Sequence, residues 1–377
     1  MGSAPEQSRL FEPLKIGDHT LSNRVVMAPL TRFRADDNHV QLPFAKEYYT
    51  QRAAGFKGTL LITEATFISP KASGYPNVPG IWNKQQIAAW KEIVESVHKA
   101  GGIIYLQLWA LGRTANPEVK EKEGTGDVVS SSDTPENSDK PEPRPLKEEE
   151  IQEYIKDYAT AAKNAVEGAG FDGVEIHGAN GYLIDQFSQS VCNQRTDMWG
   201  GSIENRSRFG LEVAKAVVDA VGANKTGIRL SPWSTFQGMK MPEKDIVPQF
   251  SHLIKGLKDL DLAYVHLVES RIAGNADIEG TEKNDVFMDL WAPKPFLLAG
   301  GFTPSSARDD VDKAYKDKDI AIVFGRYFIS NPDLVYRLQH DIEFTKYNRD
   351  TFYIPKSKEG YIDYPYSEAW QKENSKL

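Results

Sequence analysis

The sequence predicts an α/β fold, a single (β/α)8 barrel with extended loops at the carboxyl ends of its strands. Eight short apolar runs rich in β-branched residues recur along the 377 residues. Amphipathic stretches of helical spacing separate several of these runs, which is typical of alternating strands and helices. The alternative is a doubly wound sheet, and it is disfavoured because no G-x-G-x-x-G turn follows the first run.

The eight predicted strands share flanking Gly, Pro or polar residues, as buried strands usually do. They are Arg24–Ala28, Thr59–Thr63, Ile103–Leu108, Gly173–His177, Gly227–Leu230, Ala263–Val268, Phe296–Ala299 and Ile320–Phe324. The predicted helices are Lys84–Ala100, Lys147–Ala169, Phe209–Val221 and Val247–Leu260. The second of these helices opens with three glutamates, which complement the helix dipole.

Two segments depart from this alternation, although we treat residues 1–377 as one domain. Residues 116–145 are rich in Glu, Lys, Ser, Asp and Pro and lie between the third strand and its helix. In a barrel this insertion is a loop on the catalytic face, either a solvated excursion or a partial lid. The extension from about residue 347 has no periodic pattern, and it either wraps the barrel or forms a subunit contact.

Composition excludes several classes of partner. The chain has 45 basic and 53 acidic residues, a net charge of −8, and no basic stripe, which argues against nucleic acid and anionic membranes. No apolar run is long enough to span a bilayer, and Met1–Phe11 has no signal core. Cys192 is the only cysteine, and the histidines show no metal-ligand spacing. We expect a cytoplasmic monomer or homodimer without a metal.

The most informative local feature follows the fourth predicted strand. His177, Asn180 and Tyr182 lie within six residues, at the point where that strand ends. A histidine and an asparagine can both donate hydrogen bonds to one carbonyl oxygen, and a tyrosine can supply a proton. This combination suits a reaction that places negative charge on a carbonyl and then quenches it.

Strand alternation gives a second, independent signal. Because successive side chains point to opposite faces, Gln107, His177 and Arg229 are predicted to point into the barrel near the strand ends. A barrel interior packed only for stability is apolar, so this cluster favours a polar ligand. The alternative is a self-satisfied network in which Glu175 partners Arg229.

The last two strands indicate a phosphate site. Gly300 and Gly301 follow the seventh strand, and Gly325 and Arg326 follow the eighth. Glycines there let backbone N–H groups approach a phosphate, and an arginine neutralises it. A ligand with a phosphate at one end and a planar polar group near Gln107 and Arg229 is consistent with flavin mononucleotide (FMN).

Longer motifs make the chain resemble the Old Yellow Enzyme family of FMN-dependent ene-reductases, in its fungal branch. The resemblance spans nearly the whole chain, from Leu10–Pro13 to Gly360–Pro365. The matching blocks, in order, are Asn23–Arg32, Gln107–Trp109, His177–Leu183, Arg195–Asp197, Gly200–Arg206, Arg229–Pro232 and Phe324–Arg326.

The resemblance implies a role for each residue at the site. The residues expected to bind FMN are Pro29, Leu30, Thr31, Ala65, Gln107, His177, Arg229, Gly300, Gly301, Gly325 and Arg326. The residues expected to bind substrate are His177, Asn180, Tyr182, Trp109, Tyr75, Phe236 and Tyr361. The catalytic residues among them would be His177 and Asn180, which hold the substrate carbonyl, and Tyr182, the proton donor.

The implied reaction has two halves. NADPH reduces the flavin, and hydride from flavin N5 then reaches the β-carbon of an α,β-unsaturated aldehyde, ketone or nitroalkene. Tyr182 protonates the α-carbon; an ordinary tyrosine pKa of about 10 keeps the phenol able to donate. Family members without this tyrosine can act as isomerases, so Tyr182 favours reduction. A non-redox or isomerising barrel enzyme and a regulatory flavin-binding protein stay open as alternatives.

Overall fold

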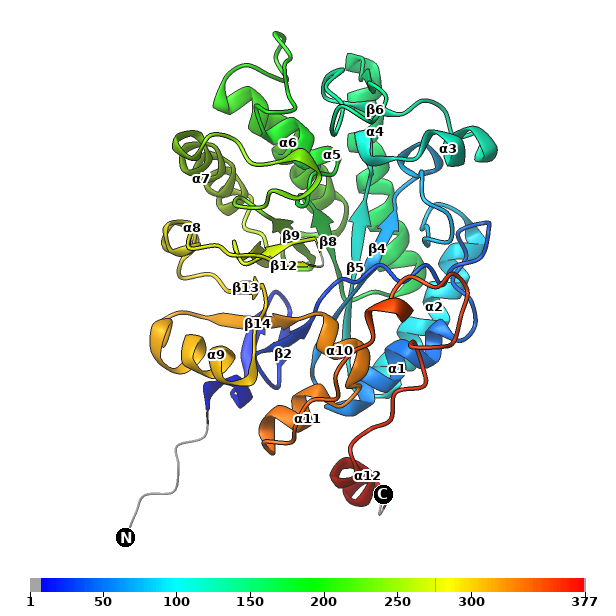
Figure 1. Cartoon of the computed structure of the whole chain (residues 1–377), viewed down its shortest axis with the longest axis vertical. Coiled ribbons are helices and arrows are strands. Elements are labelled where there is room, and N and C mark those ends of the chain that lie inside the picture. Colours follow the sequence, from blue (N-terminus) through cyan, green and yellow to red (C-terminus); the bar gives the residue numbers. More distant parts are fainter. Residues whose placement is uncertain (1–7, 275, 376–377) are drawn as a thin grey trace.

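The computed structural model describes residues 8–274 and 276–375, so most of the N-terminal segment searched for a signal core lies outside them. Eight parallel strands form a closed barrel in the order β10-β13-β14-β3-β4-β5-β8-β9, with helices around it (Figure 1). The predicted fold class is confirmed, and closure excludes the doubly wound alternative. The strands are β3 (Val25–Met27), β4 (Leu60–Phe67), β5 (Ile103–Trp109), β8 (Gly173–His177), β9 (Thr226–Leu230), β10 (Tyr264–Val268), β13 (Phe296–Ala299) and β14 (Ile320–Phe324).

The four predicted helices are present with different ends, and the barrel carries further helices that were not predicted. The longer ones are α1 (Ala45–Gly55), α2 (Lys84–Lys99), α4 (Glu148–Lys163), α6 (Ile203–Val221) and α7 (Glu243–Asp259). The shorter ones are α5 (Leu183–Ser188), α8 (Asp285–Trp291), α9 (Pro304–Asp309), α10 (Arg326–Ser330), α11 (Leu334–Gln339) and α12 (Glu368–Asn374). A π-helical turn continues α4 to Ala169, where the predicted helix ends.

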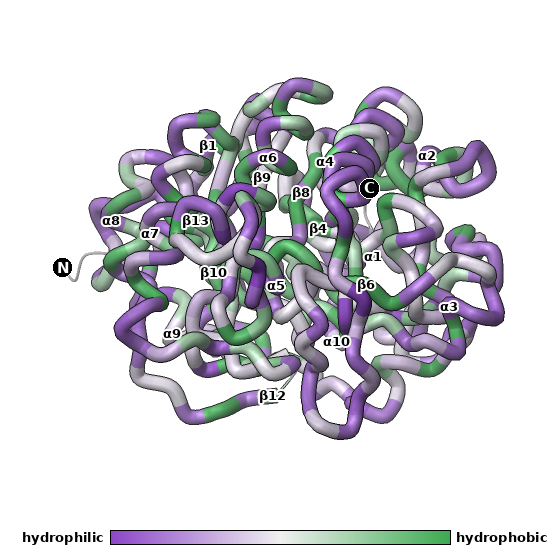
Figure 2. Tube along the Cα trace, turned by 90° about the horizontal axis from the view of Figure 1, so that it is seen from above, coloured by the Kyte–Doolittle hydropathy of each residue, from purple (hydrophilic) through white to green (hydrophobic). Residues whose placement is uncertain are grey.

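Alternation along the strands separates two apolar clusters. Ile104, Leu106 and Leu108 of β5 pack outward among the helices. Tyr105 of the same strand faces inward, with Tyr264 and Leu297. The hairpin of β1 (Leu14–Ile16) and β2 (His19–Leu21) joins this inner cluster and closes one end of the barrel. In the view from above, polar stretches lie on the outer helices and loops (Figure 2).

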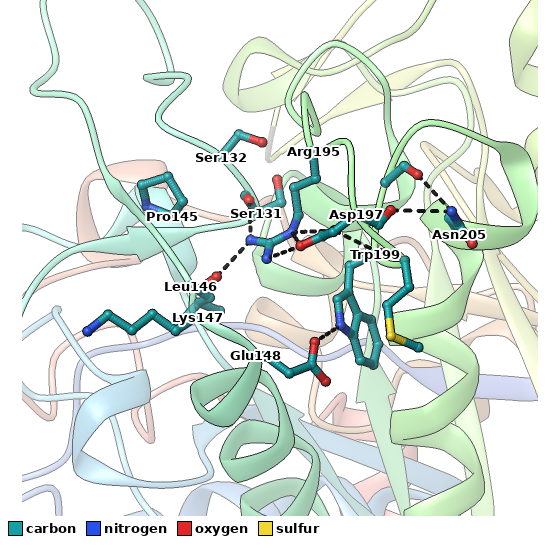
Figure 3. A network of polar contacts seen from close by, with 12 residues as sticks. Ser131, Ser132, Pro145, Leu146, Lys147, Glu148, Arg195, Asp197, Trp199 and Asn205 are labelled. Atoms are coloured by element: carbon teal, nitrogen blue, oxygen red, sulfur yellow. Dashed lines mark hydrogen bonds and ion pairs between the residues drawn. The ribbon is translucent and has the colours of Figure 1, made fainter.

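The insertion at residues 116–145 is partly ordered secondary structure. It contains α3 (Pro117–Glu123) and a pair of two-residue strands, β6 (Val129–Ser130) and β7 (Arg144–Pro145). Arg195, after β8, donates to the carbonyl oxygens of Ser131 at 2.9 Å and Leu146 at 2.7 Å and pairs with Asp197 at 2.7 Å (Figure 3). These contacts tie the insertion to the loop after β8.

The C-terminal extension wraps the barrel. Arg32 donates to the carbonyl oxygens of Phe352 at 3.0 Å and Gly360 at 2.8 Å. Arg34 donates to the carbonyl oxygen of Ser357 at 2.9 Å. The ring of Tyr361 stacks on Tyr48 with centroids 4.0 Å apart. Residues 352–361 are therefore fixed to the loop that follows β3.

Candidate active site

A cavity of about 690 Å³ opens at the carboxyl ends of the barrel strands. All but one of the residues predicted to bind cofactor or substrate line it. From the cofactor set these are Pro29, Leu30, Thr31, Ala65, Gln107, His177, Arg229, Gly300, Gly301, Gly325 and Arg326. From the substrate set they are Tyr75, Trp109, Asn180, Tyr182 and Phe236.

Tyr361 is the exception, and the prediction that it shapes the substrate pocket is wrong. Its side chain is fully buried, stacked on Tyr48 beneath the guanidinium groups of Arg32 and Arg34. Aromatic residues slightly earlier in the extension line the cavity instead, namely Tyr347, Phe352 and Tyr353. The absence of periodicity in this extension left no signal for choosing among its tyrosines.

A left-handed turn after β8 sets the positions of Asn180 and Tyr182, the two candidate site residues that follow His177. Asn180 has φ 58° and Gly181 has φ 76°, an arrangement that asparagine and glycine tolerate best. The backbone N–H of Asn180 donates to Ser231 Oγ at 2.7 Å, and that of Gly181 donates to Asp185 Oδ2 at 2.9 Å. Both bonds hold the turn, so Asn180 and Tyr182 line one cavity.

His177 is a neutral hydrogen-bond donor. Burial, with the charges of Arg229 and His266, holds the pKa of His177 well below its usual range. The backbone N–H of Ala179 donates to His177 Nδ1 at 3.4 Å, which assigns the ring proton to Nε2. The Nε2–H group is then free to donate to a carbonyl oxygen in the cavity.

Tyr182 is a protonated acid within an aromatic wall. Its ring packs edge-on against Trp109 and His177, with centroids 4.8 and 4.9 Å apart. Burial, with the neighbouring Tyr75, raises the pKa of Tyr182 above the usual value. The phenol therefore keeps its proton throughout the neutral range.

Gln107 and Arg229 line the cavity as predicted. Glu175, however, is hydrogen-bonded to Gln107 and not to Arg229. Glu175 accepts hydrogen bonds from Gln107 Nε2 at 2.7 Å and Tyr264 Oη at 3.0 Å, and its Oε2 lies 2.9 Å from His266 Nδ1. Burial would raise the pKa of Glu175, but His266, Arg229 and Gln107 together lower it. Glu175 is thus satisfied without a hydrogen bond to Arg229.

Arg229 keeps an unsatisfied donor at the cavity. Its Nε is buried and, among the residues that the structure describes, has no hydrogen-bond partner. A buried N–H without a partner is costly. The self-satisfied network considered for this cluster is therefore incomplete at Arg229, and a ligand with acceptor atoms beside it fits.

The far end of the cavity is built from glycine backbone. Gly300 has φ 143° and Gly301 has φ 62°, and a Cβ on Gly300 would lie 2.5 Å from the Cβ of Glu269. Arg326 lines this end and forms two hydrogen bonds, at 2.5 and 2.7 Å, with Asp277. Glycine backbone and one arginine suit a phosphate, so the cavity residues fit FMN at both ends.

Within residues 8–274 and 276–375, no group of three or more His, Cys, Asp or Glu side chains could hold a metal ion. No helix in that part of the chain is both long and apolar enough to cross a membrane. Cys192 is buried, and its Sγ lies 3.6 Å from Ser130 Oγ.

Comparison with known proteins agrees with the geometry. Residues 9–344 match the NADH:flavin oxidoreductase / NADH oxidase family. The chain is 57% identical over 366 residues to the chanoclavine-I aldehyde reductase fgaOx3 of Penicillium roqueforti (strain FM164), covering 97% of this chain and 98% of that protein. It is 55% identical over 369 residues to the probable inactive dehydrogenase easA of Claviceps purpurea (strain 20.1), covering 96% of both.

A solved structure shares the fold throughout. The Old Yellow Enzyme from Pichia sp. AKU4542 superposes with a TM-score of 0.88 and 38% identity, covering 96% of this chain and 94% of that one. The family match, the fungal relatives and this shared barrel show that the chain belongs to the Old Yellow Enzyme family of FMN-dependent oxidoreductases.

Proposed function

We propose that the protein reduces the C=C bond of an α,β-unsaturated aldehyde, using FMN as cofactor and NADPH as the source of electrons. The observation that carries this proposal is one shared cavity. His177, Asn180 and Tyr182 line it together with Gln107 and Arg229, so two carbonyl donors and an acid lie beside the flavin-binding residues. The name of fgaOx3, an aldehyde reductase, supports an aldehyde as the substrate. Enones and nitroalkenes present similar acceptor oxygens.

The residues of this chain would hold FMN at two ends. Gln107 and Arg229 would bind the ring, with Pro29, Leu30 and Thr31 along it, and the backbone of Gly300, Gly301 and Gly325 with Arg326 would bind the phosphate. When bound and reduced by NADPH, FMN would supply the hydride that adds to the β-carbon. Arg229 contributes a positive charge that favours an electron-rich ring.

The substrate carbonyl would accept hydrogen bonds from His177 and Asn180. As hydride reaches the β-carbon, the π electrons move toward the carbonyl oxygen, and these two donors stabilise the enolate. Tyr182 then gives its hydroxyl proton to the α-carbon, and water restores the proton to the phenolate. One hydride and one proton thus saturate the double bond while the aldehyde is retained.

The direct test is purification followed by anaerobic turnover. We expect a yellow protein whose flavin absorbance is bleached by NADPH and restored by an enal such as cinnamaldehyde, with the saturated aldehyde as product. A colourless protein that takes up no FMN would favour a non-redox or isomerising enzyme. A bleached protein that no enal, enone or nitroalkene reoxidises would favour a regulatory role, and an alcohol product would contradict C=C reduction.

A further inference from the structure

The left-handed turn at Asn180 and Gly181 is held by side chains from outside it. Both of its backbone N–H groups donate to side-chain oxygens. Its carbonyl oxygens accept hydrogen bonds, that of Asn180 from Gln237 Nε2 and that of Gly181 from Gln186 Nε2, both at 2.8 Å. Because all four polar backbone groups have partners, the conformation that places Asn180 and Tyr182 at the cavity is fixed by its surroundings.

Asp185 is the charged residue among these partners. Its side chain is fully buried in α5, and its Oδ2 accepts the hydrogen bond from the Gly181 N–H at 2.9 Å. Burial raises the pKa of Asp185 to about 6, against the hydrogen bonds from Gln189 and Gly181, which lower it. The group is therefore mainly a carboxylate at neutral pH, and both of its oxygens only accept hydrogen bonds.

Gln189 occupies the second oxygen of this carboxylate. It follows Asp185 by one helical turn, is also fully buried, and donates from Nε2 to Asp185 Oδ1 at 2.8 Å. That bond fixes the orientation of the amide and leaves its Oε1 for other donors. Oε1 accepts from the backbone N–H groups of Lys240 at 3.1 Å and Met241 at 3.2 Å. Asp185 and Gln189 thus form a continuous chain of hydrogen bonds from the turn after β8 to the loop after β9.

The loop after β9 contributes to the cavity. Phe236, within this loop, is one of the cavity-lining residues. The loop also packs directly on the turn, because a Cβ on Gly181 would lie 3.0 Å from the Cβ of Gln237 and 3.1 Å from the Cγ of Met239. The turn and the loop are therefore joined by close packing and by the Asp185–Gln189 chain of hydrogen bonds.

We propose that Asp185 and Gln189 are positioning residues, which hold the left-handed turn in register with the loop that carries Phe236. The substrate would then meet the carbonyl donor and the acid in one fixed arrangement. The inference rests on the proposed function, in which Asn180 and Tyr182 act on the enal. Neither Asp185 nor Gln189 lines the cavity, so both act through the backbone of the turn.

Asp185→Asn tests the chain of hydrogen bonds, because an amide keeps the shape but offers one acceptor oxygen to two N–H donors. Gly181 or Gln189 then loses its partner. We expect reoxidation of the reduced enzyme by α-methylcinnamaldehyde to slow about tenfold or more, and the dissociation constant of a phenol to rise about threefold or more. The saturated aldehyde, analysed at low conversion, should lose enantiomeric excess, because its α-carbon takes a proton from water as well as from Tyr182.

Gln189→Glu combined with Asp185→Asn exchanges the carboxylate and the amide. The carboxylate at position 189 can accept from Lys240, Met241 and the new amide, whose oxygen accepts from Gly181. We expect this double variant to return to within about threefold of the wild-type rate and to regain the enantiomeric excess. Gln189→Glu alone places two carboxylates side by side and should be impaired at least as much as Asp185→Asn.

Ser188→Ala is the matched control on the same helix. Ser188 is buried, and its Oγ donates to the carbonyl oxygen of Ile184 at 3.1 Å, so the variant loses a hydrogen bond of α5 that does not reach the turn. Its rate should change by less than about twofold, and its enantiomeric excess should stay the same. The affinity for FMN, measured by quenching of flavin fluorescence, should be equal in all variants.

The possible results distinguish the two proposals. If Tyr182→Phe changes neither the rate nor the enantiomeric excess, the proposed acid fails, and the phenol affinities alone decide whether Asp185 and Gln189 position Asn180. If Tyr182→Phe changes both but Asp185→Asn changes neither, only the positioning role fails. An exchange variant no better than Asp185→Asn, or a parallel loss of FMN affinity, would show general structural damage and would overturn the inference. A wild type that takes up no FMN would overturn both proposals.

Discussion

One backbone conformation decides where the functional side chains point. The left-handed residues Asn180 and Gly181 turn the chain sharply after β8, so His177 and Tyr182 approach to a ring separation of 4.9 Å. The residue types at this turn were enough to predict an oxyanion site with an acid. The hydrogen bond that Gln237 Nε2 donates to the backbone oxygen of Asn180 at 2.8 Å could not be predicted, because the two residues lie 57 positions apart and no motif links them.

Tyr182→Phe is expected to separate the two half-reactions. The substitution removes the acid and leaves the ring that packs on Trp109, so reoxidation by an enal should slow about a hundredfold. Bleaching of the flavin by NADPH should keep its rate. Stopped-flow absorbance measures both rates on one preparation, and equal losses in the two would contradict the assignment of Tyr182 as the acid.

Replacing both His177 and Asn180 by Ala should weaken the binding of phenols, whose phenolate oxygen resembles the enolate oxygen. Each hydrogen bond to a charged oxygen contributes about 1.5 kcal/mol or more, so losing both should raise the dissociation constant about a hundredfold. Titration of the long-wavelength absorbance of the phenol complex checks this. Phe33→Leu, a change at the cavity wall without a donor, serves as the control, and an unchanged affinity in the double variant would refute the assignment.

At the scale of elements, strands were predicted better than helices. Gly173–His177, Phe296–Ala299 and Ile320–Phe324 agree with the structure in both boundaries, because buried apolar runs between turn residues have sharp ends. The strand predicted at Thr59–Thr63 continues to Phe67, past an irregularity between Ile62 and Ala65, since its polar residues Thr63 and Glu64 resemble a loop.

The helices were predicted less accurately than the strands, for reasons that can be identified in particular residues. The helix predicted to begin at Phe209 begins at Ile203. Ser202 is its N-cap and accepts a hydrogen bond from the backbone N–H of Asn205. This serine could have been used to predict the start of the helix. Helix α1 was not predicted, because its buried residues include Tyr48, Tyr49 and Arg52 and do not form an apolar stripe. The contacts of Arg52 with Phe328 and Ile329 exist only in the folded chain.

Asp277, in the hairpin of β11 (Ile272–Ala273) and β12 (Ala276–Asp277), pairs with Arg326, which we propose to bind the phosphate of FMN, and would compete with that phosphate. The Asp277 carboxylate pairs with this arginine, which lowers the pKa of Asp277. We predict that Asp277→Asn strengthens FMN binding by about three- to fivefold, the size of an exposed ion pair. Quenching of flavin fluorescence on titration into apoprotein measures it. The control is Asp37→Asn, which breaks a remote ion pair with Lys356 and should not change FMN binding. Weaker FMN binding by Asp277→Asn would contradict the prediction and show that Asp277 orients Arg326 for the phosphate.

At the scale of the whole molecule, a buried carboxyl group makes stability depend on pH. Glu64 accepts hydrogen bonds from Gln41 at 2.7 Å and Tyr49 at 3.2 Å, and burial raises its pKa from 4.5 to about 7. Between these two values the folded state binds more protons than the unfolded state. The stabilisation is therefore complete below pH 4.5 and is lost as the pH rises through about 7.

Glu64→Gln should remove this dependence, because glutamine keeps an oxygen that accepts both hydrogen bonds. Between pH 5 and 7.5 we expect the wild type to lose roughly 1 to 3 kcal/mol of unfolding free energy that the variant keeps. Urea denaturation at the two pH values measures the difference. Glu92→Gln, at a side chain that is 72% exposed, is the matched control, and parallel pH profiles for Glu64→Gln and the wild type would contradict the prediction.

The clasp between Arg32, Arg34 and residues 352–361 has a consequence for biosynthesis. The loop after β3 carries Thr31 at the cavity, and its final position depends on backbone oxygens from Phe352 to Gly360. A ribosome adding about 5 to 20 residues per second needs on the order of half a minute to make the intervening chain. The flavin pocket is therefore completed only after most of the chain has been translated, and cofactor capture must follow synthesis of the clasp.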